Sequence, residues 1–281
     1  VKCWGYNVYG QLGDGTTVQK TTPVAVSNLS GAIGLSAGRY HTCARLSDGT
    51  AKCWGYNVHG QLGDGTTTTR TTPVTVPGLA GVTGISGGGY HTCAALENGL
   101  VRCWGYNTSG QLGNGTTAST VPVAAAGVSN VIDLSAGHEG DYTCVVLSDG
   151  AAQCWGDNSN GQLGDGTAAD RTTAVTVSGL SNVAQISAER IHTCARLSDG
   201  TAKCWGYNGY GQIGDGTTTQ RTTPVVVSGL TGLTSIAVGY DHTCATLTDA
   251  SAKCWGRNVY GGLGDGTTTN RTTPTLVLSF P

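Results

Sequence analysis

The chain carries 11 cysteines, and ten of them form five pairs whose partners are ten residues apart. The pairs are Cys43/Cys53, Cys93/Cys103, Cys144/Cys154, Cys194/Cys204 and Cys244/Cys254. Cysteines bind metals or oxidise to disulfides, but the chain lacks Cys-x-x-Cys and this regular spacing is not a zinc-ligand pattern. We therefore expect five disulfides. Disulfides persist in oxidising compartments, which predicts an extracellular or cell-surface protein.

The residues between the paired cysteines predict β-hairpins. Four pairs enclose Ser-Asp-Gly or Glu-Asn-Gly at the midpoint, and the last encloses Thr-Asp-Ala. Such sequences are typical of short hairpin loops with glycine in the left-handed conformation. If Leu46 and Thr50 form the hydrogen-bonded closing pair, Cys43 lies opposite Cys53 at a non-hydrogen-bonded position. The Cα atoms of such a pair are about 4.5 Å apart, which a disulfide accepts.

Two other residue types could bind metal ions, and we assign both a structural role. Histidine precedes Thr-Cys in four copies, and Tyr142 replaces it in another; the histidines are His41, His91, His192 and His242. We expect each to cap the start of a strand with a local hydrogen bond. Asp-Gly-Thr sequences resemble part of a calcium loop and begin at Asp14, Asp64, Asp165, Asp215 and Asp265. Each offers one nearby carboxylate, whereas calcium takes about six to eight oxygens, so we expect turns. No metal or cofactor is predicted.

Catalysis has no support in the sequence. There is no glycine-flanked nucleophile, no paired carboxylate common to the repeats and no phosphate-binding loop. The formal net charge is −2 without basic or acidic blocks, which argues against nucleic acid or an anionic membrane as partner. No apolar run is long enough to cross a membrane. These features predict a protein that is not an enzyme, does not bind nucleic acid and does not insert into membranes.

The cysteines, histidines and Asp-Gly-Thr sequences recur in a repeat of about 50 residues. Cys-Trp-Gly begins at intervals of 50, 50, 51, 50 and 50 residues, at Cys3, Cys53, Cys103, Cys154, Cys204 and Cys254. Within residues 82–123 we expect four strands, which we call A to D, near 82–86, 91–96, 100–105 and 121–124. Four antiparallel strands at this period are typical of a β-propeller blade. A parallel β-helix is the alternative, but its coils are shorter and lack the regular B–C hairpin.

The predicted fold class is therefore all-β, a β-propeller in a single domain over residues 1–281. Five complete blades and half of a sixth are visible, and the whole ring would have six blades or seven. The half blade covers 1–26, and the full blades cover 32–77, 82–124, 131–177, 183–227 and 234–277. Cys3 is left without a partner. We expect the chain to be part of a longer one, in which a His-Thr-Cys segment beyond Pro281 completes the half blade and pairs with Cys3.

The chain resembles the regulator-of-chromosome-condensation repeat family. The residues that carry this resemblance are Trp54-Gly55-x-Asn57-x-x-Gly60-Gln61-Leu62-Gly63, Pro73, the glycine-rich loop and His91-x-x-Ala94, and they recur in the other copies. The resemblance implies a β-propeller, which in this family is usually seven-bladed. The founding member is a nuclear guanine-nucleotide exchange factor that binds chromatin, a role with which the paired cysteines disagree. The chain looks more similar to secreted bacterial members, several of which act as binding modules, including enzyme inhibitors.

The repeats differ most where a ligand would be recognised. Strand alternation places the A–B and C–D loops on one face and the B–C turns on the other. The A–B loops supply the candidate ligand-binding residues Arg39, Tyr40, Tyr90, His138, Glu139, Asp141, Glu189, Arg190, Tyr240 and Asp241. Nearby C–D positions add Tyr6, Tyr9, Tyr56, His59, Tyr106, Tyr207, Tyr210 and Tyr260, which either bind a ligand or pack between blades. Tyrosines with scattered charges suit recognition of a protein or a polysaccharide.

These features lead to three functional hypotheses. The first is a non-enzymatic extracellular scaffold that binds a protein or a glycan at the loop face. The second is a structural subunit of a surface layer or filament, in which copies of the chain contact one another. The third is a lectin, against which the unequal A–B loops argue. Exposed threonine loops such as Thr66–Thr72 could be O-glycosylated, and N-glycosylation sequons begin at Asn28, Asn107, Asn114 and Asn270.

Overall fold

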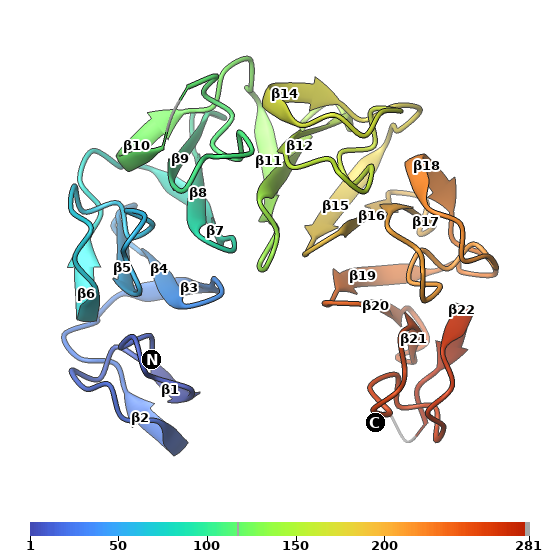
Figure 1. Cartoon of the computed structure of the whole chain (residues 1–281), viewed down its shortest axis with the longest axis horizontal. Coiled ribbons are helices and arrows are strands. Elements are labelled where there is room, and N and C mark those ends of the chain that lie inside the picture. The colour runs from blue at the N-terminus through green and yellow to red at the C-terminus, as the bar shows by residue number, and fades with distance from the viewer. Residues whose placement is uncertain (117, 279–281) are drawn as a thin grey trace.

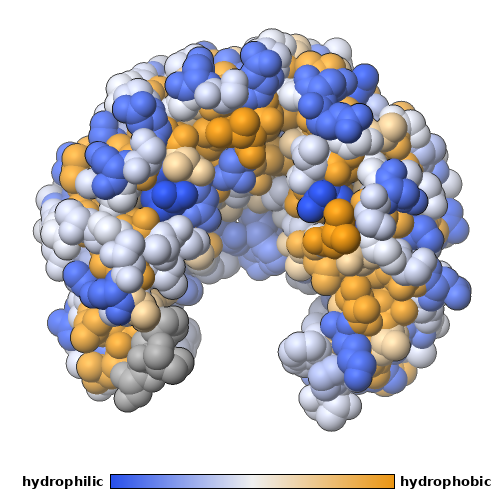
Figure 2. Space-filling model, turned by 180° about the vertical axis from the view of Figure 1, so that it is seen from behind, coloured by the Kyte–Doolittle hydropathy of each residue, from blue (hydrophilic) through white to orange (hydrophobic). Residues whose placement is uncertain are grey.

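The structure is a computed structural model that describes residues 1–116 and 118–278. Six antiparallel sheets follow one another around an arc, and the first and last sheets face each other across its open side (Figure 1). Five of the sheets have four strands each, and the first has two. The space-filling view shows the same arc with a central hollow that continues into the open side (Figure 2). The fold is a β-propeller of five blades and part of a sixth.

The strands occur in chain order within each blade. The half blade holds β1 (Lys2–Gly5) and β2 (Lys20–Ala25). Blade I holds β3 (Ala32–Ala37), β4 (His41–Leu46), β5 (Ala51–Gly55) and β6 (Arg70–Thr75), and blade II holds β7 (Val82–Gly87), β8 (His91–Leu96), β9 (Val101–Gly105) and β10 (Ser119–Ala124). Blade III holds β11 (Val131–Ala136), β12 (Tyr142–Leu147), β13 (Ala152–Gly156) and β14 (Arg171–Thr176). Blade IV holds β15 (Val183–Ala188), β16 (His192–Leu197), β17 (Ala202–Gly206) and β18 (Arg221–Val226), and blade V holds β19 (Leu233–Val238), β20 (His242–Leu247), β21 (Ala252–Gly256) and β22 (Arg271–Leu276).

Each B–C hairpin has the register that the cysteine spacing predicts. In blade I, Leu46 N–H donates to the Thr50 carbonyl at 2.9 Å and closes the loop. Asp48 stabilises the turn by accepting a hydrogen bond from the Thr50 backbone at 2.9 Å. Cys43 then lies opposite Cys53. The structure contains all five disulfides, each with a Cα–Cα distance of 4.1 Å.

The Asp-Gly-Thr sequences form turns, as expected, and in four of them the aspartate also pairs with an arginine six residues later. Asp64 Oδ1 accepts hydrogen bonds from the backbone and hydroxyl of Thr66 at 3.0 and 2.7 Å. Its other oxygen pairs with Arg70 at 2.8 Å. The same pairing recurs six residues after Asp165, Asp215 and Asp265, and Lys20 takes that place beside Asp14. Each carboxylate is therefore occupied by its own turn. The described residues contain no cluster of three or more His, Cys, Asp or Glu arranged for a metal ion.

The C–D loop of one blade binds the next blade through a single backbone carbonyl. The Gln61 carbonyl of blade I accepts hydrogen bonds from the Thr92 hydroxyl at 2.8 Å and from the Trp104 indole at 2.9 Å, both in blade II. Trp104 is fully buried and packs on the Cys43–Cys53 disulfide of blade I. Gly63 permits this approach, because a Cβ there would lie 2.7 Å from the indole nitrogen. Trp4 has no described blade before it and is 60% exposed.

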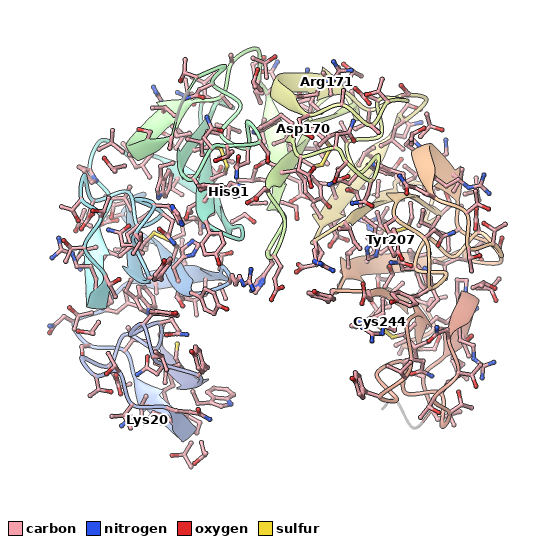
Figure 3. All side chains as sticks on the ribbon, viewed as in Figure 1. Lys20, His91, Asp170, Arg171, Tyr207 and Cys244 are labelled. Carbon is pink, nitrogen blue, oxygen red and sulfur yellow. A yellow bond between two sulfur atoms is a disulfide. The ribbon has the colours of Figure 1, made fainter. Side chains whose placement is uncertain are left out.

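The local caps expected of the histidines are wrong for His41, His91 and His192, because these three side chains bond across the blade interface. His91 Nε2 lies 2.9 Å from the hydroxyl of Thr143 in blade III (Figure 3 labels His91). The Thr143 hydroxyl donates to the Gln111 carbonyl at 3.1 Å, so the imidazole must supply the hydrogen of the first bond. His41 and His192 make the equivalent bonds to Thr92 and Thr243. The histidine side chain is long enough to reach across the interface to the next blade, and its imidazole ring is fully buried there.

Three of the four sequons begin at an exposed or partly exposed asparagine, and one begins at a buried asparagine. Asn28 and Asn270 are exposed, and Asn114 is partly exposed. Asn107 is only 7% exposed, and its amide donates to the Asn114 side chain and the Thr116 carbonyl. A glycan on Asn107 would break these bonds and displace the loop, so this sequon is the least accessible of the four in the folded chain. No helix of the kind that spans a membrane occurs in the described part of the chain.

Candidate functional site

The candidate ligand-binding residues lie together on one face of the propeller. The A–B loops follow β3, β7, β11, β15 and β19, and the C–D segments follow β5, β9, β13, β17 and β21. Alternating strand direction brings both sets to the same end of each blade. We call this surface the loop face. It divides into an aromatic part, an acidic centre and a second aromatic part.

The first aromatic part is a continuous chain of seven rings over the half blade and blades I and II, which we call the first aromatic tract. Its members are Tyr6, Tyr9, Tyr40, Tyr56, His59, Tyr90 and Tyr106. Neighbouring ring centroids are 4.8–6.5 Å apart. These rings pack on each other across blades and yet remain partly or fully exposed. They can therefore serve both in packing between blades and in contact with a ligand.

Arg39 adds a positive charge to the first aromatic tract. Its guanidinium carbon lies 5.2 Å from the Tyr40 ring centroid and 5.7 Å from that of Tyr90. Both distances are within the range of a cation–π interaction. The side chain thus bridges blades I and II from an exposed position. Burial raises the pKa of the neighbouring Tyr90 phenol, so that ring stays neutral.

The centre of the loop face is acidic and contains the longer A–B loop of blade III. His138 Nδ1 lies 3.9 Å from Glu189 Oε1 of blade IV. Burial, followed by the charge of Glu139, raises the pKa of Glu189 to about 7. Burial also lowers the pKa of His138 and raises that of Asp141. A buried carboxyl with a pKa near 7 exchanges a proton around neutral pH, so the His138–Glu189 contact is not a fixed ion pair there.

The second aromatic part lies over blades IV and V and combines tyrosines with arginines; we call it the second aromatic tract. The tyrosines are Tyr207, Tyr210, Tyr240 and Tyr260, and the arginines are Arg190 and Arg257. The Arg190 guanidinium lies 4.5 Å from the Tyr240 ring centroid. Arg257 lies 5.1 Å from that of Tyr210 and pairs with Asp241 at 3.0 Å.

Arg257 and Asp157 were not among the predicted binding residues, because the candidates chosen at the position after Cys-Trp-Gly were the tyrosines of the other copies. Four copies have tyrosine there, whereas blades III and V have Asp157 and Arg257. Asp157 accepts a hydrogen bond from the buried Gln162 amide at 2.8 Å. A comparison of the copies at this position would have identified both residues. Their effect on the face depends on neighbouring blades, which the repeat alone does not give.

Comparison with solved structures shows that the fold is that of known propellers. The crystal structure of human WBSCR16 superposes with a TM-score of 0.86 and 23% identity, over 98% of this chain and 75% of that chain. Yeast Prp20 in complex with Kap60 gives a TM-score of 0.61 and 19% identity, over 98% and 83%. Prp20p of Saccharomyces cerevisiae, studied for binding to Gsp1p and histones, gives 0.59 and 18%, over 98% and 85%. Comparison with curated protein sequences found no match.

The family models match the repeats along nearly the whole chain. Two models of the regulator of chromosome condensation (RCC1) repeat match it five times each. The first matches residues 3–45, 48–95, 98–146, 149–196 and 199–246. The second matches residues 33–61, 82–111, 131–162, 183–212 and 233–261. Since these matches recur at the period of the blades and cover most of the sequence, the chain belongs to the regulator of chromosome condensation (RCC1) repeat family.

Proposed function

We propose that this protein is a non-enzymatic extracellular scaffold that binds another protein at the loop face. The observation that carries the proposal is the first aromatic tract. Its seven rings form one partly exposed surface across three consecutive sheets. Tyrosine is enriched at the centre of protein interfaces because it supplies a large contact area with few rotatable bonds. The sheets of the half blade and of blades I and II support these side chains.

The ring geometry favours a protein over a polysaccharide. Neighbouring rings are tilted by 43–75° to one another, and six of the eleven ring pairs pack edge against face. Each ring therefore spends part of its face on its neighbour, and the tract offers no flat platform for successive sugar rings. Arg39 adds a cation within the tract, and arginine and tyrosine together are the residues that dominate protein interfaces. The solved propeller of yeast Prp20 was obtained bound to a protein, Kap60, which supports protein binding as a use of this fold.

Tyrosine truncation in the first aromatic tract tests the proposal. Oxidised wild-type protein, the Tyr56→Ala and Tyr90→Ala variants, and Leu100→Ala on the opposite face serve as baits for proteins from the surface fraction of the source cells. Leu100 is 37% exposed beside a B–C turn, so its variant controls for general loss of apolar surface. A partner retained by wild type and Leu100→Ala is then purified and measured by calorimetry. We expect each tyrosine variant to weaken binding by about 30-fold, equivalent to about 2 kcal/mol.

Two outcomes contradict the proposal. If the retained proteins bind all four baits equally, the loop face is not the binding surface. If retention disappears after the partner is deglycosylated, the ligand is a polysaccharide rather than a protein surface.

The extracellular part of the proposal rests on the five disulfides. All five cysteine pairs are linked, and most of these sulfurs are buried between blades. We expect natively isolated protein to resist alkylation at these ten cysteines until it is reduced, after which peptide mapping finds all ten modified. Alkylation of the pairs without prior reduction would indicate a reducing compartment and contradict this assignment.

A further inference from the structure

A pocket of about 370 Å³ opens on the loop face within the second aromatic tract. It is lined by residues of blades III, IV and V, chiefly Asn160, Arg190, Tyr207, Tyr210, Tyr240 and Arg257. Tyr207, labelled in Figure 3, lies between the strands of blade IV and those of blade V. The volume is within the range of small-ligand pockets, which is roughly 300–1,000 Å³. It can hold one or two amino-acid side chains of a bound peptide.

The pocket is formed where the repeats depart from one another. Arg257 follows Cys-Trp-Gly, where most copies have tyrosine. Asn160 occupies the position of Tyr9 and Tyr210, and its smaller side chain leaves space. Gly209 replaces the valine, threonine or serine of the other copies, and a Cβ there would collide with the Tyr207 phenol oxygen. These changes combine at one place because blades III, IV and V are adjacent.

The charges in the pocket do not cancel. Arg257 Nη1 pairs with Asp241 Oδ2 at 3.0 Å, and Asp241 is only 6% exposed. Arg190 makes no ion pair with any residue that the structure describes, and its guanidinium is held over the Tyr240 ring at 4.5 Å. Two guanidinium groups and one carboxylate therefore line the pocket. The excess of one positive charge is carried by a side chain that stacking already orients.

Building on the proposed function, we propose that this pocket binds the carboxylate of an acidic segment of the partner protein. The planar guanidinium of Arg190 can donate two parallel hydrogen bonds to a carboxylate, which gives both strength and orientation. Tyrosine rings around it supply contact area for the aliphatic part of a glutamate side chain. A peptide fits better than a small inorganic anion, because an anion alone would leave most of the pocket and the tyrosine faces uncovered.

The probe for this inference is a defined acidic peptide. N-acetylated, C-amidated Glu-Ala-Glu and its Gln-Ala-Gln counterpart are titrated into the oxidised protein, and the arginine Nε–H signals are followed by NMR. We expect saturable shifts with the glutamate peptide and none with the glutamine peptide. We expect Arg190→Gln to weaken binding at least tenfold, and Arg190→Lys to weaken it less because the charge remains. Arg45→Gln, beside a B–C turn on the opposite face, makes the same charge change and should bind like wild type.

Four results overturn the inference. Equal binding of both peptides, or unchanged binding by Arg190→Gln with native circular dichroism, removes the carboxylate contact. Binding of inorganic phosphate that is as tight as the peptide, and lost in the same variant, makes the pocket a small-anion site. Partner binding that depends on Tyr56 and Tyr90 but not on Arg190 would refute this inference while leaving the proposed function intact.

Discussion

Trp104→Ala is expected to lower the free energy of unfolding by about 3–5 kcal/mol. Trp104 is fully buried, and it packs on the disulfide and on Leu62 of the preceding blade. Truncation removes this contact and leaves a cavity between two rigid sheets that cannot close around it. It also removes the indole hydrogen bond to the Gln61 carbonyl. The measurement is urea unfolding of the oxidised protein.

Trp4→Ala is the matched control, because Trp4 occupies the same position in the half blade. With 60% of its side chain exposed, Trp4 gives up little burial, and its loss should change the free energy of unfolding by less than about 1 kcal/mol. Trp104→Phe keeps most of the buried area and should lose mainly the hydrogen bond, about 1 kcal/mol. Equal destabilisation by Trp4→Ala and Trp104→Ala would refute the inter-blade role of this tryptophan.

Acidification below about pH 6.5 is expected to destabilise the protein steeply, because three histidines are held neutral between blades. Burial lowers the pKa of His41, His91 and His192 to about 3 from the model-peptide value of 6.5. Above pH 6.5 these histidines are neutral in both the folded and the unfolded chain, and they do not lower stability. As the pH falls below 6.5, they become protonated in the unfolded chain but stay neutral in the folded chain, so stability is lost. Each buried histidine then lowers stability by about 1.4 kcal/mol per pH unit, or about 2 kcal/mol at pH 5.

His91→Gln isolates this effect, since glutamine can still donate a hydrogen bond to Thr143. We expect the variant to lose less stability than wild type between pH 7 and pH 5, by about 2 kcal/mol in urea unfolding. Glu189 works in the opposite direction, because its raised pKa makes the folded state bind the proton more readily on acidification. That contribution is common to both proteins and cancels in the comparison. Equal slopes for wild type and His91→Gln would contradict the prediction.

Most of the fold could be predicted from local spacing. The ten-residue separation of Cys43 and Cys53, with Asp48 and a glycine at the turn, is enough to specify the hairpin register. The period of about 50 residues then indicates repeated blades, and four strands per period indicate a propeller. These inferences succeed because hairpin hydrogen bonds join residues close in sequence. The register of such a pair depends on few residues.

The contacts between blades could not be read in the same way. His91 was expected to bond locally, but its partner Thr143 is 52 residues away in the next blade. Arg257 and Asp157 were missed because their significance depends on which residues of adjoining blades lie beside them. The sequence placed the tyrosines on the loop face. It could not predict that they form two tracts, because this depends on the angle between successive blades.

The sequence by itself therefore determined the strands, the disulfide pairs, the repeat and the family resemblance. Only the tertiary structure decided that the histidines lock neighbouring blades, that Asn107 is buried, and that Arg190 and Arg257 line one pocket. The physical reason is that hydrogen bonding within a hairpin is set by neighbours along the chain. The packing of the sheets around the ring determines which side chains are buried. It also determines which side chains from different blades meet, and therefore the net charge of the pocket that they line.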